Sequence, residues 1–418
     1  MRRKAVGIIL VGLSAIVGCS SANTGSSGSG APTGTKSPKP VTVGRFVFPL
    51  GQASGSTVKV GLVNSNNQIP QLASAAQAAA TYVNSHFNGI AGHPIQLVVC
   101  DEKADPAAAS TCTPQFVQNR VVAVIGFPLV WTSIGGLTGL ASANIPYLGE
   151  GQGAAGQSAP NAFPMLGGEV EALNFVTQFA AQGIKTVNYL TVNFPASISS
   201  EKSIEQPFWS ARGISIPHAV FYTSGAADVT TPAIQAMKGN PSAIFVAVGS
   251  QDIVRIVAAL RQAGYKGRIF ATYGALTPQL YPAAASVMNG VTSESQLLYF
   301  LDTGNPEVRL MSTILGSGIK PDSYSQMGVA QVLTLADIGN HIGGTLTGAK
   351  ILDYMKNLKS QKIFMGYEMN ASQIPSKEPD LAHVTNTFSR FMTYDGKNWN
   401  YSSGWVSAFW SAAPHVGS

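Results

Sequence analysis

One stretch of the chain, residues 121–153, constrains the fold more than any other. Val121–Ile125 is a short apolar run of the kind found in buried parallel strands. A polar loop at residues 126–133 and a glycine-containing helix follow, and the apolar run Ile145–Leu148 then leads into a second polar loop at residues 149–153. This order of strand, loop, helix, strand and loop is typical of parallel α/β sheets, where ligands bind outside the carboxyl ends of the strands. The two loops are therefore predicted to form one wall of a small-molecule cleft.

The composition indicates a large globular protein. Its 418 residues are enough for two hydrophobic cores, and 45% hydrophobic against 11% charged residues excludes a disordered chain. The net charge is +6, but the lysines and arginines are scattered and form no basic stripe, so we expect no nucleic-acid partner. The histidines and cysteines are not spaced as metal ligands, so we expect neither a metal site nor a cofactor.

The N-terminal segment combines three features of an export signal. Arg2, Arg3 and Lys4 form a basic start, residues 5–18 form an apolar stretch too short to span a bilayer, and small residues precede Cys19. The pattern resembles a bacterial lipobox, which implies that residues 1–18 are a cleaved signal peptide and that Cys19 is lipidated. The alternative is an ordinary signal peptide with an incidental cysteine. Lipidation would anchor the exported protein to the outer face of the cell membrane.

Residues 19–57 are predicted to form a flexible tether, because serine, glycine and proline dominate their first part. The more apolar Val41–Leu50 has two interpretations, a short strand or a segment lying on the folded body. No later apolar run is long enough to cross a bilayer, so the sequence predicts no other membrane-spanning segment.

The folded body is predicted to contain two βα units of similar build, near residues 58–180 and 183–290. In the first unit, Asp105 is expected to cap a helix that has Pro106 at its first position. In the second unit, Ser250 is expected to cap a helix. Strands are expected at residues 58–63, 95–99, 186–191, 218–222, 243–248 and 268–272, and helices at 70–87, 199–211, 228–238 and 253–263. This alternation predicts parallel sheets with right-handed crossovers.

The last part of the chain adds helices at residues 324–341 and 347–358 and then a hairpin. Asp395-Gly396 lies between two strands and is the strongest short-range hairpin signal. Its aromatic neighbours are expected to pack across the strands rather than to bind a ligand. A strand at 291–301 is expected to pass between the two units.

The two remaining cysteines, Cys100 and Cys112, are predicted to form a disulfide, because an exported protein occupies an oxidising compartment. The alternative is two separate buried thiols.

The order and spacing of several segments resemble the type I periplasmic binding proteins of the leucine/isoleucine/valine-binding family, the substrate-binding subunits of ABC importers. The segments include VKVGLV (58–63), VVCDEKADPAAASTC (98–112), VVAVIG (121–126), NIPYLGEG (144–151), YLTVNFPAS (189–197) and YDGKNW (394–399). The resemblance implies an α/β fold of two Rossmann-like lobes with parallel sheets, joined by a three-crossing hinge that closes on a ligand.

The same resemblance implies where the chain crosses between lobes. Crossings are expected near Gly183, near Val291 and around residues 380–390. The first ligand-binding lobe would then comprise residues 58–182 and 292–385, and the second residues 183–291 and 386–418.

The resemblance also implies a ligand site. Family members hold a ligand carboxylate with hydroxyls and loop N–H groups, and the matching positions are Thr132, Ser133, Gly151, Gln152 and Gly153. The two hydroxyl residues have an alternative role as N-caps of the following helix.

Three aromatic residues, Trp131, Phe194 and Tyr273, are expected to line the pocket, although each has an alternative role in loop packing. Family members that bind amino acids place an acid after the strand at 268–272, where this chain reads Thr-Tyr-Gly-Ala. Because a buried ammonium without a countercharge is costly, we expect an aromatic acid, an amide, a urea-like molecule or another apolar ligand with an anion. Gln251 or Asp252 could substitute for the missing acid.

The expected function is therefore capture of a small polar or amino-acid-like ligand between two lobes, by hinge closure, in an extracytoplasmic lipoprotein that serves an ABC permease. The alternatives are a ligand-sensing receptor of the same fold that does not serve transport, and an exported hydrolase. No G-x-S-x-G, Walker loop or catalytic His and acid set occurs, so we expect no catalytic residues and no enzyme activity.

Overall fold

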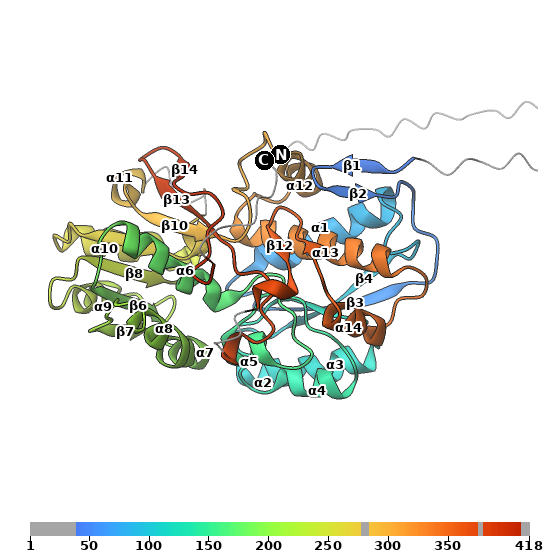
Figure 1. The fold of residues 1–418 in the computed structure, drawn as a ribbon, viewed down its shortest axis with the longest axis horizontal. Coiled ribbons are helices and arrows are strands. Elements are labelled where there is room, and N and C mark those ends of the chain that lie inside the picture. The colour runs from blue at the N-terminus through green and yellow to red at the C-terminus, as the bar shows by residue number, and fades with distance from the viewer. Residues whose placement is uncertain (1–38, 277–283, 375–378, 411–418) are drawn as a thin grey trace, which may run out of the picture. The chain divides into compact units, whose positions relative to one another are not determined.

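Two separate sheets organise the chain (Figure 1). The protein is described here from a computed structural model, which covers residues 39–276, 284–374 and 379–410. The expected signal peptide, the first part of the tether and Cys19 lie outside the described residues. None of the described helices has the length and apolar character needed to cross a bilayer.

The first sheet has three parallel strands in the order β4-β3-β5, namely β3 (Val58–Asn64), β4 (Ile95–Asp101) and β5 (Val124–Phe127). The apolar run Ile145–Leu148 does not form a strand of this sheet. It pairs with β5 through a single bridge between Tyr147 and Val124. The helices between and around these strands are α1 (Pro70–His86), α2 (Pro106–Ser110), α3 (Cys112–Gln118), α4 (Gly136–Ser142) and α5 (Gly153–Ser158). Asp105 caps α2 through its side chain, as predicted.

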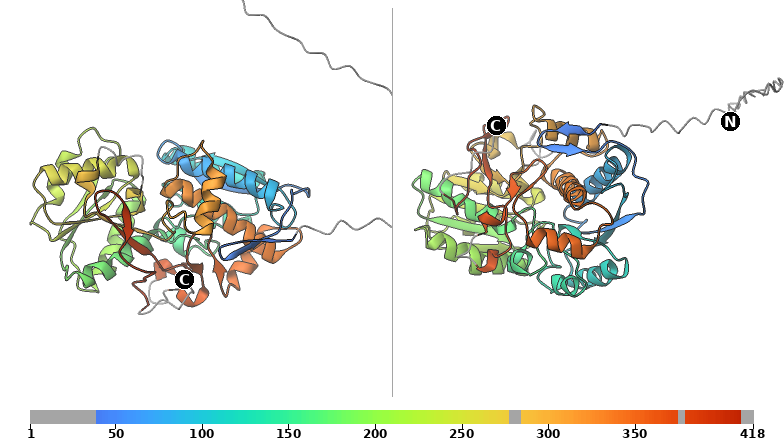
Figure 2. Two further views of the ribbon diagram at one scale, coloured as in Figure 1. Left: turned by 90° about the horizontal axis from the view of Figure 1, so that it is seen from above. Right: turned by 45° about the vertical axis from the view of Figure 1, so that its right-hand side comes forward.

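Helices from the late part of the chain complete this first lobe. They are α12 (Pro306–Leu315), α13 (Ser323–Ile342) and α14 (Gly348–Lys356). Figures 1 and 2 show α12 and α13, in orange, beside the blue helix α1, and both pack against it. The side chain of Gln331 in α13 hydrogen-bonds both the N–H and the carbonyl of Gly126 at 2.9 and 3.2 Å, which fixes the end of β5.

The second sheet has seven strands in the order β14-β13-β10-β9-β8-β6-β7. Strands β6 to β10 run parallel to one another. Strands β13 and β14 form a hairpin, and β13 pairs antiparallel with β10. The strands are β6 (Val187–Val192), β7 (Ala219–Tyr222), β8 (Ala243–Ala247), β9 (Arg268–Ala271), β10 (Thr292–Ser295), β13 (Arg390–Tyr394) and β14 (Trp399–Tyr401). A further short pair lies outside this sheet, β11 (Gln361–Lys362) and β12 (Glu368–Met369).

The helices of the second lobe are α6 (Gly168–Ala181), α7 (Pro195–Ser200), the π-helical turn η1 (Glu201–Glu205), α8 (Gln206–Ser210), α9 (Thr230–Ala236), α10 (Ser250–Gln262) and α11 (Ala285–Met288). Short 3₁₀ turns are η2 (Tyr273–Ala275), η4 (Ala371–Gln373) and η5 (Pro379–Leu381). The helix expected at 199–211 is therefore interrupted by the π-turn. Ser250 begins α10 but does not cap it, because Gly249 occupies the N-cap.

The lobe boundaries differ from those expected. Helix α6 packs in the second core, where Phe175 contacts Phe245, Phe270 and Phe391. Strand β10 pairs with β9 and so also belongs to the second sheet. The reason is that α6 is apolar on most of its surface and is buried by the sheet that follows it, so Gly183 marks a helix-to-strand turn rather than a crossing.

The expectation of a flexible tether over residues 19–57 is wrong for its last part. Strands β1 (Val41–Val43) and β2 (Phe46–Phe48) form a hairpin on the first lobe. Phe46 and Phe48 are buried, and the Phe48 ring stacks on Phe87 at a centroid distance of 4.5 Å. Burial of two aromatic side chains offsets the entropy of ordering this segment.

The predicted disulfide between Cys100 and Cys112 is confirmed. It joins the end of β4 to the first residue of α3, and both cysteines lie in a buried cluster with Phe116 and Trp131.

Candidate functional site

A cleft of about 170 Å³ lies where strands of both sheets end. Phe127 is the last residue of β5, and Ile69 follows the loop after β3. From the other lobe, Val192, Val248 and Tyr273 line the cleft at the ends of β6, β8 and β9. The carboxyl edges of two parallel sheets therefore face one cavity, which is the usual ligand position in such folds.

Three of the predicted ligand-binding residues, Gln152, Phe194 and Tyr273, line this cleft. Ser250 and Asp252 also line it and flank Gln251, whose side chain is outside the described part of the structure. These residues come from both lobes, because Gln152 precedes α5 and the others follow strands of the second sheet.

The three residues predicted from the first loop do not line the cleft, although Leu129 of the same loop does. The Trp131 side chain is buried in the first lobe, and its indole N–H donates to Thr113 Oγ1 at 3.0 Å. Thr132 is also buried, and the hydroxyl of the exposed Ser133 donates to the carbonyl of Val130 at 2.7 Å.

The carboxylate of Glu102 explains the position of this loop. It is fully buried and accepts hydrogen bonds from the N–H groups of Leu129, Val130 and Trp131, the last two at 3.2 and 2.7 Å. It also accepts a bond from Ser65 Oγ at 2.7 Å. Successive N–H groups of this kind form an anion-binding nest. In this protein the nest is filled by the chain's own carboxylate.

The second predicted loop uses its N–H groups in the same way. Gly151 donates to the carbonyl of Leu166 at 2.9 Å, and Gly153 donates to Glu169 Oε1 at 2.8 Å. Neither glycine lines the cleft. The N–H groups of Trp131, Gly151 and Gly153 are therefore already used within the chain, whereas the buried hydroxyl of Thr132 has no partner among the described residues.

The cleft instead carries acidic side chains. Glu169 and Glu171 project from the first turn of α6, Glu205 ends the π-turn, and Asp252 lies in the first turn of α10. No lysine, arginine or histidine is among the described residues that line the cavity. The charge of the site is therefore negative or, where the acids are protonated, neutral.

Two of these four acids are fully engaged by the protein. Asp252 forms an ion pair with Arg255 at 2.9 Å and accepts bonds from Tyr222 and from the N–H of Gly225, both at 2.8 Å. Glu169 accepts bonds from Gly153, Ser200 and Gln157. Both acids therefore serve to fix loops and helices at the rim of the cleft.

Glu205 differs because one of its oxygens, Oε2, has no hydrogen-bond partner among the described residues. Its side chain is 4% exposed and reaches the cleft from the π-turn. Single π-turns inside α-helices are frequent at functional sites, because they redirect one side chain. Burial raises the pKa of Glu205 to about 8.

Glu171 belongs to a group of buried carboxyls behind the cleft. Burial, followed by the charges of Glu294 and Glu150, raises its pKa well above the ordinary range. Burial also raises the pKa of Glu294, to about 8. None of these three forms a salt bridge within the described residues, so burial favours the neutral form of each. The described residues contain no cluster of three or more potential metal ligands.

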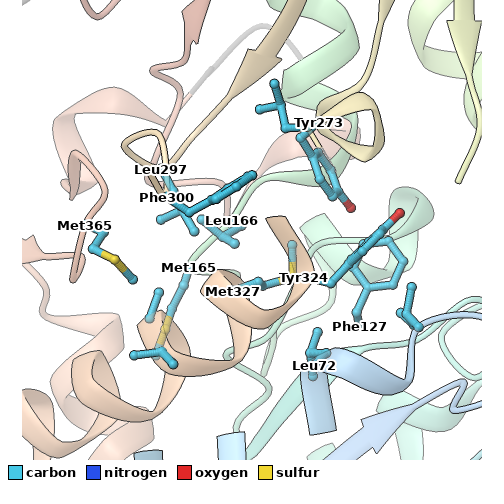
Figure 3. Packing of buried hydrophobic residues seen from close by; sticks show 14 of the residues in the cluster. Leu72, Phe127, Met165, Leu166, Tyr273, Leu297, Phe300, Tyr324, Met327 and Met365 are labelled. Atoms are coloured by element: carbon cyan, nitrogen blue, oxygen red, sulfur yellow. The ribbon is translucent and has the colours of Figure 1, made fainter. Parts of the chain in front are cut away.

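Aromatic side chains from both lobes form another part of the wall. Tyr273 is directed toward Tyr324 (Figure 3), with ring centroids 5.6 Å apart. The Phe127 ring packs edge-on against Tyr273 and Tyr324, with ring centroids 6.3 and 6.0 Å apart. Tyr324 lies at the start of α13 in the first lobe, whereas Tyr273 follows β9 in the second.

Sequence reasoning missed Glu169, Glu171, Glu205 and Tyr324. One signal was present, because the two acids at the start of α6 open a helix that is otherwise mostly apolar. Glu205 and Tyr324 had no comparable local signal, since Glu205 lies in a π-turn and Tyr324 in a helix buried on all sides, neither of which the local sequence indicates.

The fold and the interlobe cleft define a bilobal solute-binding protein. The family model described as Periplasmic binding protein matches residues 61–374, and the chain belongs to this family. Members of the family are solute-binding proteins rather than enzymes.

Solved structures share the fold at low sequence identity. A possible leucine/isoleucine/valine-binding protein from Rhodopirellula baltica has a TM-score of 0.71 at 14% identity, over 84% of this chain and 97% of that one. A fatty acid ABC transporter substrate-binding protein from Thermomonospora curvata has a TM-score of 0.70 at 15% identity, over 88% of this chain and 96% of that one. A leucine binding protein from Thermotoga maritima has a TM-score of 0.68 at 16% identity, over 84% of this chain and 99% of that one. The comparison with curated protein sequences yields no match.

Proposed function

We propose that this protein is the extracytoplasmic solute-binding lipoprotein of an ABC importer, which captures a small molecule between its lobes and presents the closed form to a permease. The observation that carries the proposal is the cleft lined by strand ends of both sheets. A ligand that touches both walls favours closure, because contacts with the second wall form only in the closed state. The fatty acid ABC transporter substrate-binding protein named above shares this fold, which supports the same role.

A thermal-shift screen tests ligand capture. Compounds of one chemical class should raise the melting temperature, with a stabilisation of about 2.7 kcal/mol at a hundredfold excess over Kd. The panel would include amino acids, fatty acids, amides, amines and sugars. If nothing in the panel shifts the melting temperature, and native mass spectrometry detects no molecule that co-purifies with the protein, the solute-binding proposal is wrong.

The proposed anchor is tested separately through Cys19. The Cys19→Ser variant, expressed in a host with a lipoprotein pathway, should move from the membrane fraction to the soluble extracytoplasmic fraction, because the acyl chains that hold it are missing. The matched control is Ser20→Ala, which leaves the acceptor cysteine in place. Membrane retention of the Cys19→Ser variant would argue against lipidation.

A further inference from the structure

The described lining of the cleft contains four carboxyl groups and no cationic side chain. The fold supplies a cationic partner for only one of these acids. Of its four acids, Asp252 is paired with Arg255, and Glu169 is saturated by donors from the protein. Glu171 and Glu205 remain without a cationic partner in the described residues. A buried carboxylate without a countercharge is costly, so the site is poised to accept a positive charge from outside the chain.

Glu205 is the acid best placed to meet that charge. It is nearly fully buried, lines the cavity, and keeps Oε2 free of any hydrogen bond within the described residues. An unpaired buried acceptor is destabilising, and a ligand donor would remove that cost. The π-turn that directs it toward the cavity begins at Glu201, which does not line the cleft.

Most of the N–H groups at the two loops where a ligand carboxylate was expected already have acceptors within the chain. The nest formed by Leu129, Val130 and Trp131 already holds Glu102, and the N–H of Gly153 already holds Glu169. A ligand anion at either loop would have to displace a buried internal carboxylate. It would then lie near further acids, where like charges repel.

The aromatic wall suits a cation with an apolar body. Phe127, Tyr273 and Tyr324 line the cleft from both lobes and contact one another. Aromatic faces attract ammonium groups, and the attraction is stronger when the cation is desolvated. Neutral polar groups such as Gln68 and Ser197 complete the lining without adding a charge.

We infer that the ligand of this site is a small organic cation, an ammonium compound with an apolar body and no carboxylate, whose charge is held by Glu205 and whose body is held by the aromatic wall. This inference rests on the proposed solute-binding function and specifies its substrate class. It differs from the expectation drawn from the sequence, which was an aromatic acid, an amide, a urea-like molecule or another apolar ligand with an anion.

Proton release is a direct consequence of this arrangement. The raised pKa of Glu205 means that the empty site holds a proton near pH 7, and an entering cation displaces it. The groups around Glu205 are Tyr189 of β6, Glu169 of α6 and Glu201 of its own turn. None is basic, so no neighbour supplies the countercharge in place of the ligand. Affinity should therefore rise up to about tenfold per pH unit between pH 6 and 8.

Calorimetric titration of the purified protein with paired probes tests the inference. Alkyl, aryl and quaternary ammonium compounds would each be compared with a neutral isostere, for example choline with 3,3-dimethylbutan-1-ol and phenethylamine with 2-phenylethanol. At least one cation should bind about a hundredfold more tightly than its neutral partner. Titration in two buffers of different ionisation enthalpy should show proton release of up to one proton per ligand.

Variants then assign the charge. Glu205→Gln should weaken binding of the cation at least tenfold at pH 8 and abolish proton release, whereas Glu201→Gln, a matched change on the same turn, should alter affinity less than threefold. Circular dichroism and melting curves would verify that both variants are folded. Binding of a neutral isostere as tightly as its cation, preference for leucine or octanoate, failure of every cation, or unchanged affinity of folded Glu205→Gln would each overturn the inference. Binding of leucine or octanoate alone would still support the solute-binding function.

Discussion

At the scale of single residues, Glu205 links the chemistry of the cleft to the stability of the fold. Because burial raises its pKa from 4.5 to about 8, the folded protein holds a proton that the unfolded chain releases over that range. Stability is therefore highest at the acidic end of this window and falls as the pH rises toward 8, by up to about 1.4 kcal/mol per pH unit for one such group.

The Glu205→Gln variant should reduce this loss. In the ligand-free protein, its free energy of unfolding should gain on the wild type as the pH is raised from 5 to 8, because the amide never ionises. Urea denaturation at several pH values measures the difference.

Asp228 provides a control of opposite sign. It is exposed, and hydrogen bonds from Thr231 and from the N–H of Thr230 lower its pKa. The wild type therefore gains stability as the pH rises through the acidic range, and Asp228→Asn, which lacks this gain, should fall behind the wild type. A pH dependence identical in Glu205→Gln and the wild type would contradict the assignment of a protonated Glu205.

At the scale of elements, the N-terminal hairpin β1–β2 is held to the first lobe by the turn residue Arg45. Its guanidinium donates to the carbonyls of Tyr367 and Ile363 at 3.0 and 2.9 Å and pairs with Glu307 at 3.3 Å. Glu307 is buried, so this contact neutralises a charge that would otherwise be costly. The hairpin is therefore an integral part of the folded body.

Arg45→Ala should lower the free energy of unfolding by about 2–3 kcal/mol, because it removes charged hydrogen bonds and leaves Glu307 without its partner. Urea denaturation gives the value. Arg45→Lys retains the charge but not the planar geometry of the guanidinium, so it should recover only part of the loss. An alanine variant as stable as the wild type would show that the hairpin is dispensable.

At the scale of the whole molecule, the two lobes carry separate sheets and share one cleft. A ligand that contacts Tyr324 on one wall and Tyr273 on the other should shift the population toward a closed form, since its affinity for that form is higher. Small-angle X-ray scattering at saturating ligand should show a smaller radius of gyration than in the ligand-free protein. Tyr324→Ala should reduce the shift, and unchanged scattering of the wild type at saturation would contradict hinge closure.

Several features of the fold were determined by local sequence alone. The alternation of apolar runs and amphipathic stretches predicts the parallel strands, because side-chain periodicity follows directly from backbone geometry. Asp105-Pro106 starts α2 and Asp395-Gly396 turns the late hairpin for equally local reasons. The disulfide between Cys100 and Cys112 was predicted from the oxidising compartment expected for an exported protein.

The tertiary structure decided the character of the site. Glu169 and Glu205 are 36 positions apart in the sequence, yet both reach one cavity because α6 and the π-turn pack on the same side of the second sheet. Glu102 fills the nest that the first loop would otherwise offer to a ligand. The charge of a cleft is a sum over side chains brought together by packing, and neither their proximity nor their internal partners can be read from periodicity or spacing.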